Sequence, residues 1–366
     1  MEKVLIIANT YFQVITAINL KLTILKESFV DIIITDISTN YDLIAARLEK
    51  TKLFNSVQTA DINEICYKKN KLIKYKSLLF WKNTLKKFIK KDNYNYDVLM
   101  FFNYDVFTYS VFNKIYECNK DIKVYRYEEG FCSYLYDFSH LIITKIYRIF
   151  RKIARKPRLE EKIEKYYFYH PDIVLFNANY EFAKIPTLDR TNIKLLEILN
   201  NVFDYEKVKE QDEYNKKYIF FEECFFCDNI GVDDFDLIMQ IADIVGKENL
   251  LVKLHPRNKI DRFSKYGIST NKTIGIPWEV IQMNRNFSDK IFLTISSGSV
   301  LASKLYFGDN IKTYLLFNCT EKMSNMVGQE YFEYLRRIQE KFGINDFCIP
   351  NNKTEFLNTL KKEVKA

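Results

Sequence analysis

The chain has 366 residues, almost half of them apolar, and a formal charge of +8 at neutral pH. This length suits two domains better than a single core, and the apolar and aromatic content excludes an intrinsically disordered chain. No apolar run reaches the ~18 residues that a membrane-spanning helix needs. The first residues, MEKVLIIANT, are typical of a β-strand and not of a signal peptide. We therefore expect a cytoplasmic protein whose seven cysteines are reduced thiols.

Most of the excess positive charge lies in two segments, 69–91 and 139–158. In the second segment, apolar residues recur at helical spacing and the basic residues Lys145, Arg148, Arg151, Lys152 and Arg155 take the opposite face. Such a helix either packs on the core with a solvated basic face or lies on the anionic inner face of the cell membrane. The charge carries no nucleic-acid-binding motif with it, so we expect no nucleic-acid partner.

Short β-branched runs alternate with stretches of helical periodicity, which predicts parallel α/β sheets. In the first half, we expect strands at 3–8, 29–35, 97–102, 122–127 and 172–176, and helices at 12–26, 40–50 and 71–90. In the second half, we expect strands at 218–223, 250–254, 290–295 and 311–316, and helices at 235–245, 278–283, 300–306 and 354–364.

The restart of this pattern predicts an α/β protein with two facing Rossmann-like domains. We expect an N-terminal domain at 1–182, a linker at 183–217, a second domain at 218–350 and a C-terminal helix at 351–366. Ligands of such sheets bind beyond the carboxyl ends of the strands. Candidate site residues are therefore sought at those ends.

An acidic pair, Glu128 and Glu129, follows the predicted strand 122–127 and is itself followed by Gly130. Glycine permits a sharp turn out of the sheet. A carboxylate at this edge could act as the general base toward a substrate hydroxyl, although a solvated turn with ordinary acidic residues fits the position equally well.

Two His-Pro dipeptides differ in their predicted placement. His170-Pro171 precedes the predicted strand 172–176 and so is expected at the amino end of the sheet, which is the wrong end for a ligand. His255-Pro256 follows the predicted strand 250–254, at the carboxyl end, with Lys253 and Arg257 beside it. An imidazole there could neutralise the phosphate of a leaving nucleotide.

Small hydroxyl residues follow the predicted strand 290–295 and precede a predicted helix. Ser296, Ser297 and Ser299 flank Gly298 there and could offer hydroxyl and backbone N–H donors to a phosphate, or cap the helix for structural reasons alone. The sequence contains no GxGxxG or GxxxxGK[ST] motif, which disfavours dinucleotide oxidoreductases, kinases and P-loop NTPases.

Two patterns with metal-ligand spacing are given structural interpretations. Asp234 and Asp236 form a DxD pattern, but they open a predicted helix, where aspartates complement the helix dipole. Cys224 and Cys227 form a lone CxxC pair in an aromatic, strand-like stretch, for which buried thiols are the favoured interpretation. We expect no metal site.

The order Glu128-Glu129-Gly130, then His255-Pro256, then Ser296-Ser297 resembles the pattern of bacterial sialyltransferases. Pro277-Trp278-Glu279 is similar to their Pro-x-Glu segment, and Thr10-Tyr11-Phe12-Gln13 is similar to the Thr-Pro-x-Gln of the lipooligosaccharide sialyltransferase family (glycosyltransferase family 52). The sequence departs from that family at Tyr11, where proline is usual, and at Glu128, where many relatives have aspartate.

The resemblance implies a GT-B fold and an inverting, metal-independent transfer of sialic acid from CMP-sialic acid to a galactose-type hydroxyl of a surface glycan, either lipooligosaccharide or capsule. It implies no cofactor. By the resemblance Glu128 is the base and His255 assists departure of the CMP phosphate. It further implies donor contacts by Pro256, Glu279, Ser296 and Ser297, and acceptor contacts by Thr10 and Gln13.

Two alternatives remain open at this point. One is a GT-B transferase that uses another nucleotide sugar or makes polysialic acid. The other is a basic, non-catalytic protein that binds a membrane or nucleic acid, for which salt-sensitive binding without a nucleotide requirement is expected. The sequence leaves the acceptor, the linkage and the oligomeric state undecided, a homodimer included.

Overall fold

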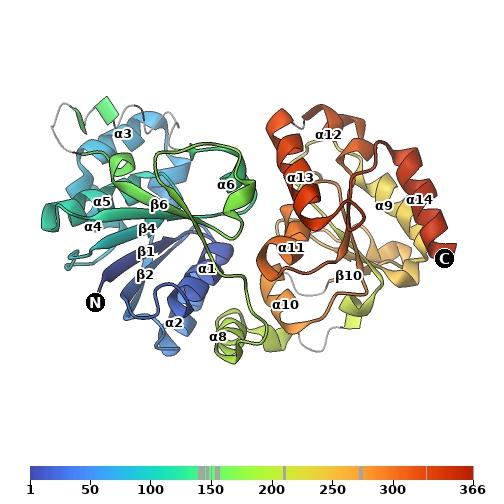
Figure 1. Ribbon diagram of the computed structural model, residues 1–366, viewed down its shortest axis with the longest axis horizontal. Coiled ribbons are helices and arrows are strands. Elements are labelled where there is room, and N and C mark those ends of the chain that lie inside the picture. Colours follow the sequence, from blue (N-terminus) through green and yellow to red (C-terminus); the bar gives the residue numbers. More distant parts are fainter. Residues whose placement is uncertain are drawn as a thin grey trace. The chain divides into compact units, whose positions relative to one another are not determined.

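The computed structural model describes residues 1–138, 145, 148, 149, 151, 152, 157–208, 212–271, 275–326 and 328–365. The chain divides into two compact units, Met1–Phe203 and Asp204–Ala366. Figure 1 shows that each unit is a sheet covered by helices. None of the described helices is long and apolar enough to cross a bilayer.

The first unit is built on a seven-stranded sheet in the order β3-β2-β1-β4-β5-β6-β7, in which every neighbouring pair is parallel. Residues 4–8 and 98–101 in its centre are apolar and buried, as is typical of a parallel sheet whose two faces are covered by helices. The strands are β1 (Lys3–Ala8), β2 (Phe29–Thr35), β3 (Ser56–Ala60), β4 (Val98–Phe101), β5 (Lys123–Tyr127), β6 (Ile163–Phe168) and β7 (Glu181–Lys184). The helices are α1 (Tyr11–Leu22), α2 (Tyr41–Lys50), α3 (Lys71–Leu79), α4 (Trp81–Phe88), α5 (Val106–Cys118), α6 (Cys132–Leu135) and α8 (Ile193–Phe203).

The second unit repeats this design with a six-stranded parallel sheet in the order β10-β9-β8-β11-β12-β13. Its central strand, β8, lies between β9 and β11. The strands are β8 (Tyr218–Phe221), β9 (Leu250–Lys253), β10 (Ser269–Thr270), β11 (Ile291–Thr294), β12 (Lys312–Leu315) and β13 (Phe347–Cys348). The helices are α9 (Asp234–Val245), α10 (Trp278–Asn284), α11 (Ala302–Phe307), α12 (Glu321–Met326), α13 (Gln329–Phe342) and α14 (Lys353–Lys365).

The alternation of strands and helices predicted from the sequence is confirmed, with one strand wrong and several elements missed. The predicted strand 172–176 does not form, and Pro171–Ile173 is a 3-10 turn between β6 and β7. A short apolar run does not by itself identify a strand, and the actual strand, IEKYYF, is aromatic and charged and not β-branched. The predicted helix 71–90 is divided at Phe80 into α3 and α4.

The boundary between the units falls inside the segment predicted as a linker, 183–217. Its first part belongs to the first unit: β7 extends the sheet, and α8 packs against α1 and α2. The basic helix predicted at 139–158 lies largely outside the described residues. Of its predicted basic face, Arg151 is buried and donates to Asn113 Oδ1 at 2.5 Å.

Candidate active site

The carboxyl ends of β1 and β5 bring Thr10 and Glu129 together in the first unit. Thr10 caps α1, where its Oγ1 accepts from the Gln13 N–H at 3.2 Å. The same hydroxyl donates to the Glu129 carboxylate, at 2.8 Å from Oε1 and 2.9 Å from Oε2. Glu129 is partly exposed. A partly exposed carboxylate that accepts from a hydroxyl at the carboxyl end of a strand can accept a proton from a substrate.

Glu128 lies on the other side of the chain and is fully buried. Its Oε2 accepts from the Tyr134 hydroxyl and from the Tyr169 N–H, the latter at 2.8 Å. Since successive residues of an extended segment point to opposite sides, only one carboxylate of the pair reaches the surface, and in this structure it is that of Glu129. The resemblance assigned the base to Glu128, whose carboxylate would first have to be uncovered.

Gly130 forms the turn that directly follows these two glutamates. Its φ is +64°, a left-handed conformation that glycine adopts without strain, as the sequence predicted. The turn lets the Ser133 hydroxyl accept from the Glu129 N–H at 2.6 Å. The Glu129 backbone is therefore fixed on the side away from its carboxylate.

Gln13, predicted to contact the acceptor, is fully buried. Its Oε1 accepts from the Asn9 N–H at 2.7 Å, and its Nε2 donates to Asn103 Oδ1 at 3.1 Å. A buried side chain with these partners ties the ends of β1 and β4 together. Of the two predicted acceptor residues, only Thr10 is accessible.

The predicted placement of His170 at the amino end of the sheet is wrong. His170 follows β6 (Ile163–Phe168) and so lies at the carboxyl end. It is 8% exposed, and its N–H lies 3.4 Å from the hydroxyl of Tyr134, which donates to Glu128. The strand on this side of His170 is 163–168, which precedes it, and the predicted strand 172–176, which follows it, does not form.

In the second unit, two buried carboxylates follow the central strand β8. Glu222 Oε2 accepts from the His255 N–H at 3.2 Å, beyond β9. Glu223 Oε1 accepts from the Ser296 N–H, beyond β11 on the other side, and from Thr294 Oγ1 at 2.7 Å. Each carboxylate anchors one flanking loop, and together they join the predicted residues His255 and Ser296 into one cluster.

The two carboxylates differ in electrostatics. Glu222 pairs with Arg262 at 2.7 Å, and Arg262 also pairs with Asp234 at 2.6 Å. Glu223 has no cationic partner among the described residues, and its Oε2 is buried without a hydrogen bond. Burial raises the pKa of Glu223 to about 7, against the lowering effect of the Ser296 and Thr294 hydrogen bonds. Glu223 is thus close to half-protonated at neutral pH.

His255 is half-buried at the carboxyl end of β9. Burial, with further contributions from Arg257 and Lys253, lowers its pKa to about 4, so the imidazole is neutral at pH 7. The Arg257 N–H lies 3.1 Å from Nδ1, which makes Nδ1 an acceptor and leaves the proton on Nε2. A neutral ring with a donor Nε2 can hydrogen-bond a phosphate oxygen.

Ser296 and Ser297 are partly exposed, and their hydroxyls are the donors they can offer. Their backbone N–H groups, predicted as phosphate donors, are occupied by Glu223 Oε1 and by Thr294 Oγ1, the latter at 3.0 Å. The segment that follows is a 3-10 turn, Gly298–Leu301, and α11 begins only at Ala302. The predicted helix start at Val300 is therefore displaced.

Glu279 lies in the first turn of α10, where burial raises its pKa and the charge of Lys253 lowers it. Lys253 is the last residue of β9, and burial lowers its pKa to about 8. Its ammonium group lies 5.6 Å from the centroid of the Trp278 ring. Glu279, the predicted ribose-binding residue, thus lies near the charge of Lys253, two residues before His255. Pro256 is exposed.

The two metal-like patterns have other partners in the structure. The carboxylate of Asp234 is buried against Arg262, and that of Asp236 lies 2.7 Å from Lys353 Nζ, while Asp233 caps α9. The cap is thus one residue before the DxD pattern. Cys224, Cys227 and Asp228 have ligand atoms close enough for a metal ion, but Arg257 already lies 3.0 Å from Asp228 Oδ2.

Sequence reasoning missed Glu222 and Glu223 as parts of the site, whereas it placed Lys253 beside His255. The sequence does indicate them, because glutamates next to a buried strand are rarely buried without a partner. Both glutamates lie within the strand predicted at 218–223, whereas β8 ends at Phe221.

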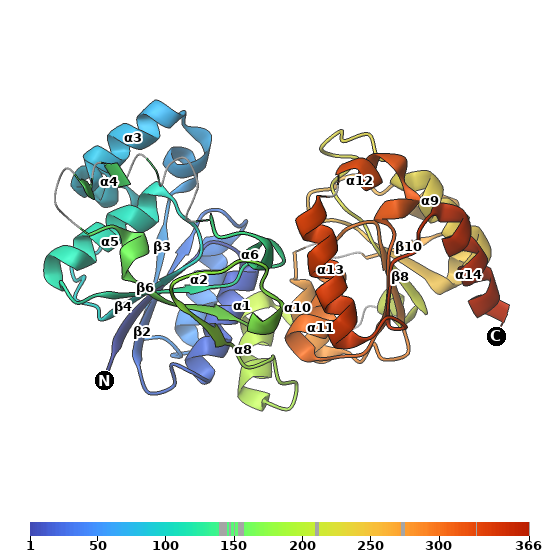
Figure 2. The same ribbon diagram turned by 45° about the horizontal axis from the view of Figure 1, so that its top comes forward.

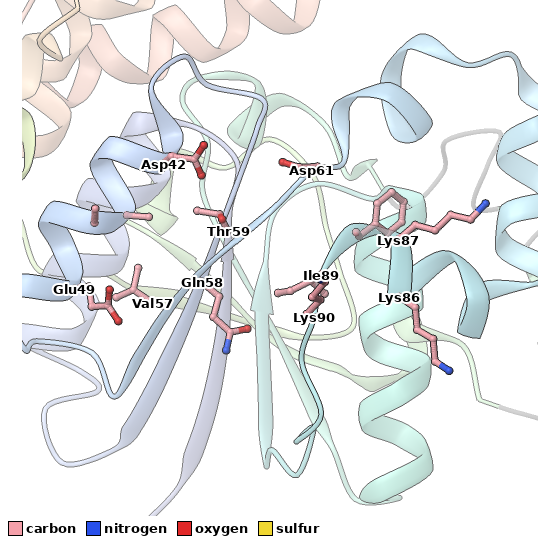
Figure 3. A pocket seen from close by; sticks show the side chains of 13 residues that line it. Asp42, Glu49, Val57, Gln58, Thr59, Asp61, Lys86, Lys87, Ile89 and Lys90 are labelled. Atoms are coloured by element: carbon pink, nitrogen blue, oxygen red, sulfur yellow. The ribbon is translucent and has the colours of Figure 1, made fainter.

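Two large pockets in the described part of the chain lie away from these strand ends. One of about 530 Å³ is bounded by α2, the edge strand β3 and α4, with Asp42 and Glu49 on one side and Lys86 and Lys87 on the other (Figure 3). A second, of about 710 Å³, shares Lys86 and adjoins it. Neither pocket contains a predicted site residue.

The sequence model of a family described as alpha-2,8-polysialyltransferase matches residues 4–316, a span that contains both strand-end clusters. The chain belongs to the alpha-2,8-polysialyltransferase family. It is therefore a glycosyltransferase of a sialyltransferase family. The narrower resemblance to the lipooligosaccharide sialyltransferase family stays a prediction. No curated protein sequence matches the chain.

Solved structures show the same fold. LpCGTa in complex with UDP is 9% identical, with a TM-score of 0.53 over 100% of this chain and 91% of that one. Arabidopsis thaliana UGT89C1 complexed with UDP-L-rhamnose is 12% identical, with a TM-score of 0.50 over 100% of this chain and 89% of that one. The predicted GT-B fold, with two parallel-sheet α/β domains, is confirmed.

Proposed function

We propose that this polysialyltransferase-family protein transfers sialic acid from CMP-sialic acid to the hydroxyl of a glycan that itself ends in sialic acid. The observation that carries the proposal is the family match across both units. It favours a sialic acid acceptor over the galactose acceptor that the motifs alone suggested. The UDP complexes of similarly folded proteins support a nucleotide-sugar donor.

The donor is assigned to the strand ends of the second unit. In this proposal, the phosphate of CMP accepts from His255 Nε2 and from the hydroxyls of Ser296 and Ser297, with Pro256 shaping the loop. Glu279 binds the ribose. A neutral imidazole suits this task because it donates a hydrogen bond without needing a counter-ion. That hydrogen bond stabilises the negative charge that the phosphate gains as CMP departs.

The acceptor is assigned to the strand ends of the first unit. We assign the base to Glu129 in place of Glu128, since Glu129 is accessible and its orientation is fixed by Thr10. Attack by the deprotonated hydroxyl on the anomeric carbon, with departure of CMP, inverts the configuration in one displacement. Protein donors to the phosphate supply the charge stabilisation, so we expect transfer without a divalent metal or cofactor.

A transfer assay tests the proposal. The protein is incubated with CMP-sialic acid or with a panel of UDP-sugars, and with acceptors that end in either sialic acid or galactose. Mass spectrometry should show added sialic acid only with the CMP donor, and more on the sialylated acceptor. Transfer from a UDP-sugar would reject the donor assignment, and transfer to galactose alone would reject the acceptor assignment.

A further inference from the structure

The segment 65–91, which follows β3 and contains α3 and α4, has ten lysines and no acidic residue. Three of these lysines lie in ion pairs within the described part of the chain, namely Lys69 with Glu64, Lys82 with Glu117 and Lys91 with Asp31. Most of the others are exposed. Such a surface attracts a polyanion.

The same segment exposes large apolar side chains. Leu72 is 78% exposed, Phe80 58%, Leu79 51% and Ile73 40%, while Leu78 is the buried residue of α3. Leu72 and Leu79 are seven residues apart, as are Ile73 and Phe80, so the four share one side of the helix. Single exposed apolar residues are ordinary, but an apolar stripe bordered by charge marks an interaction surface.

Helix α3 packs on α4 and α5 with its other side. Figures 1 and 2 show it on the outside of these helices in the first unit. Lys71 and Lys76 lie on the same helix as the apolar stripe and are exposed. A helix that exposes apolar side chains beside lysines is suited to the interface of an anionic bilayer, because the apolar side chains insert among the lipids and the lysines contact the lipid phosphates. A soluble polyanion would contact the lysines but would leave the leucines exposed to water.

This surface is connected to the acceptor site. The hydroxyl of Tyr67, just before α3, donates to Asp105 Oδ2 at 3.0 Å and accepts from Asn103 Nδ2 at 3.1 Å. Asn103 in turn accepts from Gln13, whose N–H is capped by Thr10. Three successive hydrogen bonds, from Tyr67 through Asn103 and Gln13 to Thr10, thus link the start of α3 to the strand ends to which the acceptor is assigned.

We propose that α3 and the flanking residues Tyr67–Asn70 and Phe80 dock the protein on an anionic lipid bilayer. Leu72, Ile73, Leu79 and Phe80 insert among the lipids, and the surrounding lysines contact lipid phosphates. The inference concerns a surface separate from both strand-end clusters, so it stands or falls independently of the proposed transfer reaction.

Co-sedimentation with lipid vesicles tests the docking surface. The full chain is mixed with phosphatidylcholine vesicles that either contain or lack phosphatidylglycerol. Binding should be about tenfold tighter to the anionic vesicles. The variants Leu72→Ser/Phe80→Ser and Lys71→Gln/Lys76→Gln should each weaken it by about tenfold. All four residues are exposed, so far-UV circular dichroism should be unchanged.

Matched controls come from exposed positions elsewhere. Ile193→Ser on α8, where Ile193 is 70% exposed, and Lys361→Gln/Lys362→Gln on α14 should bind vesicles like the unmodified protein. Failure to bind anionic vesicles would overturn the proposal. So would salt-sensitive binding that Leu72→Ser/Phe80→Ser leaves intact, because that outcome describes a surface for soluble polyanions. Transfer to a soluble acceptor should be the same in all variants, whatever the vesicles show.

Discussion

Both units carry the dipeptide Glu-Glu at the carboxyl end of a strand, yet the pairs differ in what they contact. Glu128 and Glu129 follow β5, where one carboxylate is buried against two tyrosine residues and the other faces outward to Thr10. Glu222 and Glu223 follow β8, where both are buried and each holds a neighbouring loop. The same dipeptide thus presents one accessible carboxylate in the first unit, which is the proposed base, and two loop-positioning carboxylates in the second.

The difference follows from the strands on either side. In the second unit β8 is flanked by β9 and β11, whose loops carry His255 and Ser296 and present N–H groups toward it. In the first unit a glycine turn at Gly130 carries the chain away, which leaves Glu129 at the surface. The exposure of the side chain, and not the residue type, therefore distinguishes the proposed base Glu129 from the carboxylates that position loops.

The largest effect on the transfer rate is expected at His255, the proposed phosphate donor in the second unit. His255→Ala should slow transfer by about a hundred- to a thousandfold, because a transition-state donor to phosphate is lost. The fold should survive, since Glu222 holds the loop through the backbone N–H of residue 255 and not through the ring. Steady-state transfer rates and thermal melting measure the two outcomes, and near-normal turnover would remove His255 from the phosphate site.

The acidic pair of the first unit comes next. Glu129→Gln keeps the size and the Thr10 contact but removes basicity, and should lower transfer by about a hundredfold. Glu129→Gln should also abolish the acid limb of the pH–rate profile. If Glu129 only positioned other groups, its replacement would leave that limb in place. CMP binding, measured by calorimetry, should persist because the donor site belongs to the other unit.

Glu128→Gln is the matched variant. We expect weaker transfer through a disturbed turn, with the acid limb of the pH profile retained. The opposite result, an acid limb lost in Glu128→Gln and kept in Glu129→Gln, would return the base to the residue that the resemblance selected. It would also mean that Tyr134 releases Glu128 when substrate binds.

A smaller effect is expected in the stability of the second unit. Glu223 has a pKa raised to about 7 by burial, so the folded state holds a proton that the unfolded state releases above its ordinary pKa of ~4.3. The free energy of unfolding should therefore fall as pH rises from about 4 to about 7, by roughly 4 kcal/mol at most, and level off above that. Glu223→Gln should remove this loss.

Urea unfolding of Glu223→Gln and the unmodified protein between pH 5 and 8 measures this difference. Comparison of the two proteins cancels the contribution of His255, whose lowered pKa acts in the opposite direction over an overlapping range. A stability difference that does not grow with pH would show that Glu223 is ionised throughout.

No effect at all is expected from metal removal. Transfer in EDTA should equal transfer in Mg²⁺ or Mn²⁺, because the carboxylates of Asp234 and Asp236 are bound to Arg262 and Lys353. Activity that disappears in EDTA and returns with metal would contradict the assigned phosphate site.

Much of the fold was predictable because buried parallel strands such as β1 and β2 are continuous apolar runs. The edge strand β3 (SVQTA) and the aromatic β6 lack that pattern and were missed. Misplacing β6 also put His170 at the wrong end of the sheet. The motifs identified His255, Ser296 and the acidic pair, but not Glu223, whose role depends on which strands neighbour β8, and strand order is not written in any local pattern.

The proposed reaction is a single inverting displacement of CMP from CMP-sialic acid by a glycan hydroxyl. Proton NMR of the reaction in EDTA, with a sialylated acceptor, tests it most directly because donor, CMP and product are seen together. We predict that CMP and sialylated product form at equal rates, and that the anomeric configuration of the product is opposite to that of the donor. A product with retained configuration, or no consumption of CMP-sialic acid while a UDP-sugar is turned over, would contradict the account.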